Sequence, residues 1–191
     1  PAAADGLAGF ASALDADSKV MIAYHVGLRT AGDAETFMLD LASRVTSLCQ
    51  LSTDGLGHYA DAVFNAFGTH VDYAQLVKTF SSEPANEARY SPPKCNGSKA
   101  RAVIGCPDPK RVCTSHVERS NLSLRTSNRR YTRLTLAFSK KIENHAHSVA
   151  IFMLHYNFCR KHLSLGGRTP AMVAGLADHV WTIDELVRLA N

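Results

Sequence analysis

Residues 49–74 read CQLSTDGLGHYADAVFNAFGTHVDYA, and this stretch indicates the fold class. Residues 49–53 predict a short strand, which ends at Asp54-Gly55. A helix is expected over residues 56–67, where apolar side chains recur at helical spacing. Residues 69–74 can form another strand, so the stretch predicts a strand–helix–strand unit.

Two further strands and a helix are expected on the N-terminal side of this unit. The strands lie at residues 10–15 and 20–26, and the polar residues 16–19 form the turn between them. A helix is expected over residues 33–48, with Asp33 as its cap. The resulting order of strand, strand, helix, strand, helix, strand is typical of an α/β fold.

An irregular insertion is expected at about residues 81–112, because prolines and glycines crowd this segment. They are Pro84, Pro92, Pro93, Gly97, Gly105, Pro107 and Pro109. Long loops of this kind in compact domains are usually functional or disordered. We expect one main domain over residues 1–165, which contains the insertion, and a short C-terminal tail over residues 166–191 packed on it.

Helices dominate the prediction after the insertion. One is expected over residues 114–128 and a longer one over residues 139–162. The longer helix has a broad apolar face, which Ile151, Leu154 and Phe158 widen, and such a face implies burial. The glycines at 166 and 167 end it, and two short helices at about 170–176 and 183–189 complete the tail.

Composition and charge narrow the class of protein. The chain has 191 residues, 46% of them hydrophobic, and a formal net charge of +4, which favours an acidic partner. No apolar run approaches the roughly 18 residues of a membrane span, so neither a membrane partner nor a signal peptide is expected. Five cysteines at irregular spacing indicate a reducing, cytoplasmic setting with unpaired thiols. The chain begins with Pro1, from which we expect an upstream portion to be missing.

Asp54 is the first candidate site residue. It follows a predicted interior strand, and in open α/β sheets functional sites form outside the carboxyl ends of strands. Gly55 lets the backbone turn sharply after it. The alternative is that Asp54 caps the next helix.

Glu118 is the second candidate site residue. It is the only acidic residue in the stretch from Lys110 to Lys141, which also carries nine basic residues. The alternative interpretation is a structural ion pair with a neighbouring arginine. The functional interpretation is a metal-ligand carboxylate beside cations that hold phosphates. Two Mg²⁺ or Mn²⁺ ions about 3.5–4 Å apart, held by carboxylates, suit phosphodiester chemistry.

A DNA-facing surface is predicted around this carboxylate. Salt-sensitive phosphate contacts would dominate such a surface. Its expected members are Arg119, Asn121, Arg125, Arg129, Arg130, Arg133, Lys140 and Lys141. The alternative is a solvated helix face, which the one-sided charge of the run disfavours.

These motifs together resemble the DDE-type transposases of bacterial insertion sequences. The similarity begins at Thr53-Asp54-Gly55 and continues in SHVERSNL at residues 115–122. It extends through NRRYTRL at 128–134, AFSKK at 137–141 and YNFCRKH at 156–162, followed by Leu165 and Thr169-Pro170. The resemblance implies an RNase H-like mixed sheet with flanking helices, two Mg²⁺ or Mn²⁺ ions, and Asp54 and Glu118 as catalytic metal ligands.

The resemblance also implies a function in DNA transposition and recombination. Its partners would be transposon ends and target DNA, with self-association on DNA and nucleoid association in a bacterial cytoplasm, and no small-molecule substrate is expected. The family triad needs an aspartate on an earlier strand. Asp15 and Asp17 match it poorly, because they lie in the predicted turn. We therefore expect the first strand to be absent and this polypeptide alone to be inactive.

Two alternatives to an active transposase remain open at this point. One is a DNA-binding remnant whose acidic site has decayed, and the other is an RNase H-like nuclease without strand transfer. A zinc site at Cys95, Cys106, Cys113 and His116 is disfavoured, because their spacings match no standard pattern.

Overall fold

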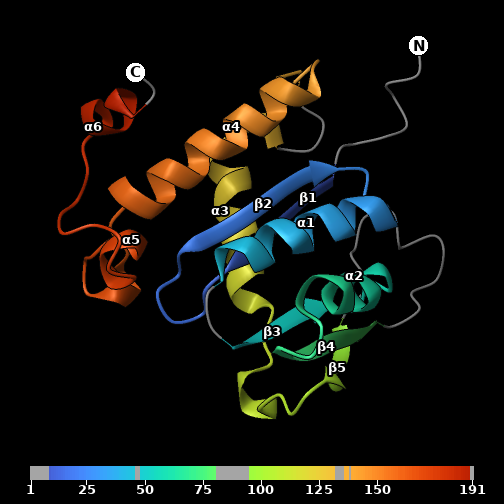
Figure 1. Ribbon diagram of the computed structural model, residues 1–191. Helices are drawn as coiled ribbons and strands as arrows, with labels where there is room; N and C mark the ends of the chain where they lie inside the picture. The colour runs from blue at the N-terminus through green and yellow to red at the C-terminus, as the bar shows by residue number, and fades with distance from the viewer. Residues whose placement is uncertain (1–8, 46–47, 81–94, 132–135, 138, 190–191) are drawn as a thin grey trace. The chain divides into compact units, whose positions relative to one another are not determined.

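The structure is a computed structural model that describes residues 9–45, 48–80, 95–131, 136–137 and 139–189 (Figure 1). The described residues form two compact units. The first unit comprises those up to Asp33 and from Ser115 onward, and the second comprises Ala34–Thr114. Each unit has its own sheet, so the predicted mixed α/β class is confirmed. The predicted domain division at residue 165 stays a prediction.

The sheet of the first unit is a hairpin of β1 (Gly9–Leu14) and β2 (Met21–Gly27). The strands are antiparallel, as the predicted strand–turn–strand pattern requires. Asp15 stabilises the turn, because its Oδ2 accepts a hydrogen bond of 2.8 Å from the Ser18 amide and another from the Ser18 hydroxyl. Burial raises the pKa of the Asp15 carboxyl, but these bonds outweigh it and hold the pKa below its usual value.

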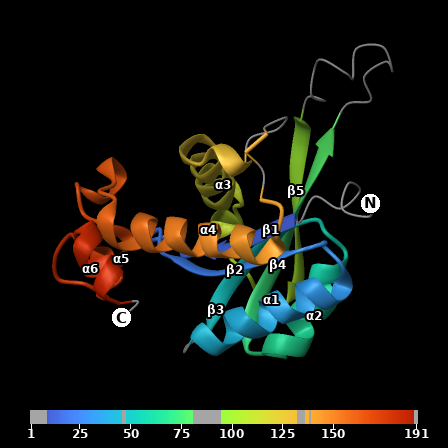
Figure 2. The same cartoon turned by 90° about the horizontal axis from the view of Figure 1, so that it is seen from above.

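Two helices cover the hairpin. They are α3 (Ser115–Ser127), which contacts β1, and α4 (Ile142–Leu154), which runs along β2 (Figures 1 and 2). The short η2 (Arg129–Tyr131) follows α3, and a π-helical turn, η3 (His155–Cys159), follows α4. The core between them is built from Met21, Leu124, Val149, Phe152, Met153 and Tyr156.

The C-terminal elements of this unit are short, as predicted. They are η4 (Leu163–Leu165), α5 (Pro170–Val173) and α6 (Ile183–Arg188). Gly166 and Gly167 have φ angles of 65° and 78°, a region that glycine adopts without steric cost, and they end η4. Thr169 caps α5, and Thr182 forms a capping box with Glu185 at the start of α6.

The sheet of the second unit has the order β3-β4-β5. β3 (Cys49–Asp54) is parallel to β4 (Val71–Phe80), and α2 (His58–Phe67) connects them. β5 (Cys95–Ile104) is antiparallel to β4, and η1 (Pro109–Arg111) follows it. α1 (Ala31–Arg44) precedes β3 and buries Phe37, Met38 and Leu41. The predicted strand–helix–strand unit is therefore confirmed.

The predicted irregular insertion was wrong for residues 95–104, which form β5. Eight consecutive residues of this strand from Cys95 are exposed, so it shows no alternation of apolar and polar positions. Backbone pairing with β4 stabilises it, and such pairing leaves no periodic signal in the sequence. Residues 81–94 of the predicted insertion lie outside the described residues.

The cap of α1 also differs from the prediction. Asp33 lies inside the helix, and Thr30 precedes it. Thr30 Oγ1 accepts a bond of 3.2 Å from the Asp33 amide, while Asp33 Oδ2 accepts bonds from the Thr30 amide and hydroxyl. This reciprocal pair resembles a capping box, in which the capping residue is the threonine.

The helix predicted over residues 139–162 is shorter than expected. α4 ends at Leu154, the π-helical turn follows, and Arg160 has an extended backbone with φ −85° and ψ 119°. Two of the residues expected to widen the buried face are exposed, Ile151 by 67% and Leu154 by 39%. Phe152 is buried in their place. No helix in the described part of the chain combines the length and hydropathy that a bilayer crossing requires.

Candidate catalytic and nucleic-acid-binding site

Asp54 is exposed at the carboxyl end of β3, where the sequence placed it. Its Oδ1 accepts a hydrogen bond of 3.3 Å from the Leu56 amide, and the Leu56 carbonyl accepts one of 3.2 Å from Gln75 Nε2. These contacts fix the loop after the strand. The helix-cap alternative is wrong, because α2 has Gly57 as its N-cap.

Buried groups behind Asp54 hold the end of β3 in place. The Thr53 hydroxyl and the Tyr73 hydroxyl lie 2.8 Å apart, and Tyr73 is fully buried. The pKa of Tyr73 is raised, mainly because the side chain is buried. The hydrogen bonds with Thr53 and Gln75 lower this pKa, and the charge of Asp54 raises it. Gly55 has no positive φ, and a Cβ there would make an ordinary 3.4 Å contact with Val77. The turn at Gly55 therefore uses a backbone conformation that other residues can also adopt.

Glu118 is exposed in the first turn of α3. A carboxylate is stabilised at this position by the unpaired amides and dipole of the helix N-terminus. Two residues that follow Glu118 hold α3 on the hairpin. Ser120, on the face opposite Glu118, has its Oγ 3.5 Å from Met21 Sδ, and Asn121 Oδ1 accepts a bond of 3.2 Å from the Ser12 hydroxyl. The hairpin contacts therefore orient Glu118 towards solvent.

Lys19 and His116 meet at the N-terminal end of α3. Lys19 Nζ lies 3.3 Å from both ring nitrogens of His116, and Lys19 has a φ of 64° in the turn between β1 and β2. This contact places the Lys19 ammonium beside His116, which is two residues before Glu118 in the first turn of α3. The sequence analysis missed it, because the two residues are 97 positions apart.

The predicted DNA-binding residues follow Glu118 in the first unit. Six of them are exposed basic side chains: Arg119, Arg125, Arg129, Arg130, Lys140 and Lys141. Asn121 is half-buried and its amide oxygen is bonded to Ser12, so it also has a structural role. Arg133 lies outside the described residues.

The two predicted metal ligands belong to different units, Asp54 to the second and Glu118 to the first. Carboxylate oxygens are the ligands that Mg²⁺ and Mn²⁺ prefer, and both side chains are exposed, so the donor chemistry fits. Among the described residues, however, there is no group of three or more His, Cys, Asp or Glu side chains that could hold a metal ion. The cysteines form no disulfide in the described part of the chain.

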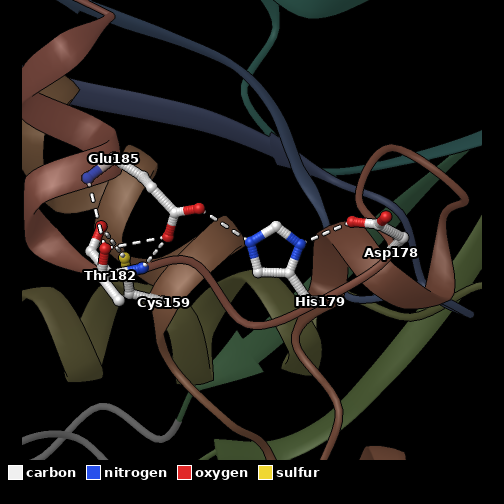
Figure 3. Close-up of polar contacts among 5 residues, drawn as sticks. All are labelled: Cys159, Asp178, His179, Thr182 and Glu185. Carbon is white, nitrogen blue, oxygen red and sulfur yellow. Dashed lines mark hydrogen bonds and ion pairs between the residues drawn. The ribbon is translucent and has the colours of Figure 1, made fainter.

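A second polar cluster lies in the C-terminal elements (Figure 3). His179 bridges two carboxylates, with Nδ1 2.6 Å from Asp178 Oδ1 and Nε2 2.9 Å from Glu185 Oε1. The bonds to Asp178 and Glu185 raise the pKa of His179 above its usual value. The Thr182 amide, His179 and the Thr182 hydroxyl lower the pKa of Glu185 to about 2. The cluster fastens α6 to the loop before it.

The exposed carboxylate at the start of α3 is followed by a one-sided basic segment, as the resemblance to insertion-sequence DDE transposases led us to expect. A comparison with family models supports this class, because the model described as IS1 transposase matches residues 103–159. This segment of the chain is thus similar to insertion-sequence transposases of the IS1 kind. The matched segment contains Glu118 and the predicted DNA-binding residues, whereas Asp54 lies outside it. Searches of the curated proteins and of the solved structures gave no match.

Proposed function

We propose that the chain is the RNase H-like catalytic part of a DDE transposase that cleaves and joins DNA strands at insertion-sequence ends. The observation that carries the proposal is the IS1 transposase match over residues 103–159, which contains the exposed Glu118 and its basic neighbours. The structure is mixed α/β, which is the fold class to which RNase H-like domains belong. The family also implies DNA as the partner, and holding two DNA ends together requires self-association on DNA.

Asp54 and Glu118 act as metal ligands in this proposal. Each is an exposed carboxylate held by a fixed backbone, at the end of β3 and in the first turn of α3. Divalent ions, when bound, activate water and stabilise the leaving oxygen of the phosphodiester. The exposed arginines and lysines bind the DNA phosphates and orient the strand towards Glu118.

The test measures Mn²⁺ binding by the purified chain. Binding is monitored by electron paramagnetic resonance, as the decrease in the signal of the free ion. Asp54→Asn and Glu118→Gln remove one charge each and keep the side-chain shape. We expect each substitution to weaken Mn²⁺ binding at least about tenfold, because carboxylate ligands supply most of the affinity. Plasmid nicking in Mn²⁺ is measured in parallel.

Matched controls separate ligand loss from a general change in charge. Glu143→Gln removes an exposed carboxylate from the first turn of α4, as Glu118→Gln does from the first turn of α3. Asp61→Asn does the same in the first turn of α2. Both controls should bind Mn²⁺ like the wild type. Wild-type affinity in Asp54→Asn and Glu118→Gln would overturn the catalytic proposal and favour a DNA-binding remnant.

A further inference from the structure

A groove of about 880 Å³ lies in the first unit, between the end of α3 and the outer face of α4. We call it the α4 groove. Its walls are formed by the residues that join α3 to η2, by one face of α4, and by the π-helical turn up to Arg160. The predicted DNA-binding surface shares one residue with it, Arg130. Its other lining residues have no role in the proposed catalytic site.

The α4 groove is cationic. Arg130 and Arg160 both line it, and none of the described lining residues is Asp or Glu. The neighbouring histidines respond to these charges. Burial lowers the pKa of His145 and Arg130 lowers it further, while burial and then Arg160 lower the pKa of His162. A groove with this charge attracts phosphate groups.

Hydrogen bonds hold the walls of the groove together. Asn128 Nδ2 donates a bond of 2.8 Å to Ser148 Oγ on α4, and Asn128 Oδ1 accepts one of 3.1 Å from the Arg130 amide. Arg130 Nη1 also donates to Ser139 Oγ at 3.2 Å, which uses one of the five guanidinium donors. The groove is therefore formed before any ligand arrives, which reduces the entropic cost of binding.

The groove is also lined by apolar and uncharged polar side chains, which are not required for binding a phosphate. Ile151 is 67% exposed and lines it, whereas Val149, Phe152 and Met153 of the same helix belong to the core. Asn144, His147 and His155 line it as exposed polar side chains. An intact duplex presents mainly phosphates to a protein surface. An unpaired strand presents base faces and base edges as well, which pack on apolar or ring surfaces and bond to amides.

We propose that the α4 groove binds a short unpaired segment of a DNA strand, with phosphates at Arg130 and Arg160 and a base against Ile151. This proposal rests on the proposed function. It adds that one DNA strand is bound in the unpaired state. The amide of Asn144 reads the edge of the base, and Asn128 keeps the arginine wall in position.

Fluorescence anisotropy tests the proposal with labelled oligothymidylate of about twelve nucleotides, a length within the site sizes of single-strand-binding domains. A duplex of the same length is the comparison probe. EDTA is present throughout, so binding does not depend on the metal site. We expect the wild-type chain to bind the single strand more tightly than the duplex.

Substitutions place the bound strand in the groove. Arg160→Gln should weaken single-strand binding about tenfold and reduce the slope of log affinity against log salt by about 0.7, the value for one phosphate contact. Asn144→Asp puts a carboxylate in the groove with little change of shape and should weaken binding by a similar factor. The controls carry the same charge changes outside the groove: Arg188→Gln on α6 and Ser164→Asp in η4, both at exposed positions.

The possible outcomes are separable. Loss of binding in the two groove variants, with wild-type binding in the two controls, supports the proposal. Equal loss in the controls would show general charge attraction and overturn it, and so would equal loss for the duplex. Failure of the wild type to bind the single strand would also overturn it. These results do not depend on the Mn²⁺ experiment, which is a separate measurement. The groove proposal and the catalytic proposal can therefore be refuted independently.

Discussion

Asn157→Ala should destabilise the first unit, because the Asn157 side chain is bonded to the backbone of β2. Asn157 Oδ1 accepts a bond of 2.9 Å from the Met21 amide, and Asn157 Nδ2 donates one of 3.0 Å to the Met21 carbonyl. Asn157 is 8% exposed and Met21 is 2% exposed, so water does not readily replace these bonds. The side chain therefore pairs with β2 as a neighbouring strand would.

The expected loss follows from the two backbone groups left without a partner. Each buried polar group that loses its hydrogen bond costs about 1–3 kcal/mol, so the alanine variant, with two such groups, should lose about 2–6 kcal/mol. Small domains have a total free energy of unfolding of about 5–15 kcal/mol. The substitution should therefore lower the urea midpoint clearly without preventing folding.

Trp181 provides the signal for the assay. It is the only tryptophan of the chain, its ring lies 4.4 Å from that of Phe158, and its amide donates to the Phe158 carbonyl. Urea unfolding followed by Trp181 fluorescence therefore reports on the unit that contains Asn157. Asn144→Ala is the matched control, because Asn144 is exposed on α4 and alanine favours the helix slightly.

The variant Asn157→Asp separates hydrogen bonding from packing. A protonated aspartic acid can accept from the Met21 amide and donate to the Met21 carbonyl, whereas a carboxylate only accepts. Burial raises the pKa of such a carboxyl above its unfolded value, so the stabilisation is present at low pH and lost as pH rises. Partial recovery relative to the wild type near pH 4 is expected. A loss below about 0.5 kcal/mol in Asn157→Ala would refute the reasoning, since this is within the range of ordinary surface substitutions.

Three further predictions concern the first unit and its junction with α1. Gly27→Ala should cost about 1–3 kcal/mol in urea unfolding, because its Cβ would lie 2.1 Å from Asp33 Oδ1, whereas Gly32→Ala, which has room, should not destabilise. Leu124→Ala should cost about 2–5 kcal/mol in the same assay, because Leu124 is 2% exposed in the core, and a smaller loss would mean that α3 does not pack there. The contact of His179 with Glu185 should weaken as pH rises through the raised pKa of His179 and, separately, as pH falls towards about 2, the pKa of Glu185. NMR titration of His179 checks this, and a midpoint at or below the ordinary histidine value would contradict it.

The sequence predicted most elements of the candidate site as well as of the fold. Asp54 was expected after a short strand and Glu118 early in a helix, and both are found there, exposed. These predictions succeed because a strand of five or six residues and a helix of three turns leave a local pattern in the side chains. The roles of the two carboxylates stay predictions. Metal ligation would require the two side chains to lie close together in space, and a local sequence pattern does not determine this.

The sequence by itself therefore determined the order and type of the helices and strands. These depend on contacts between residues a few positions apart. The tertiary structure decided the features that depend on distant partners. β5 exists because its backbone pairs with β4, and the Asn157 amide, 136 positions from Met21, is bonded to β2. The α4 groove likewise depends on Asn128 reaching Ser148. Hydrogen bonds of this kind are made by ordinary polar groups with no periodic pattern, so only the folded chain shows which partners they find.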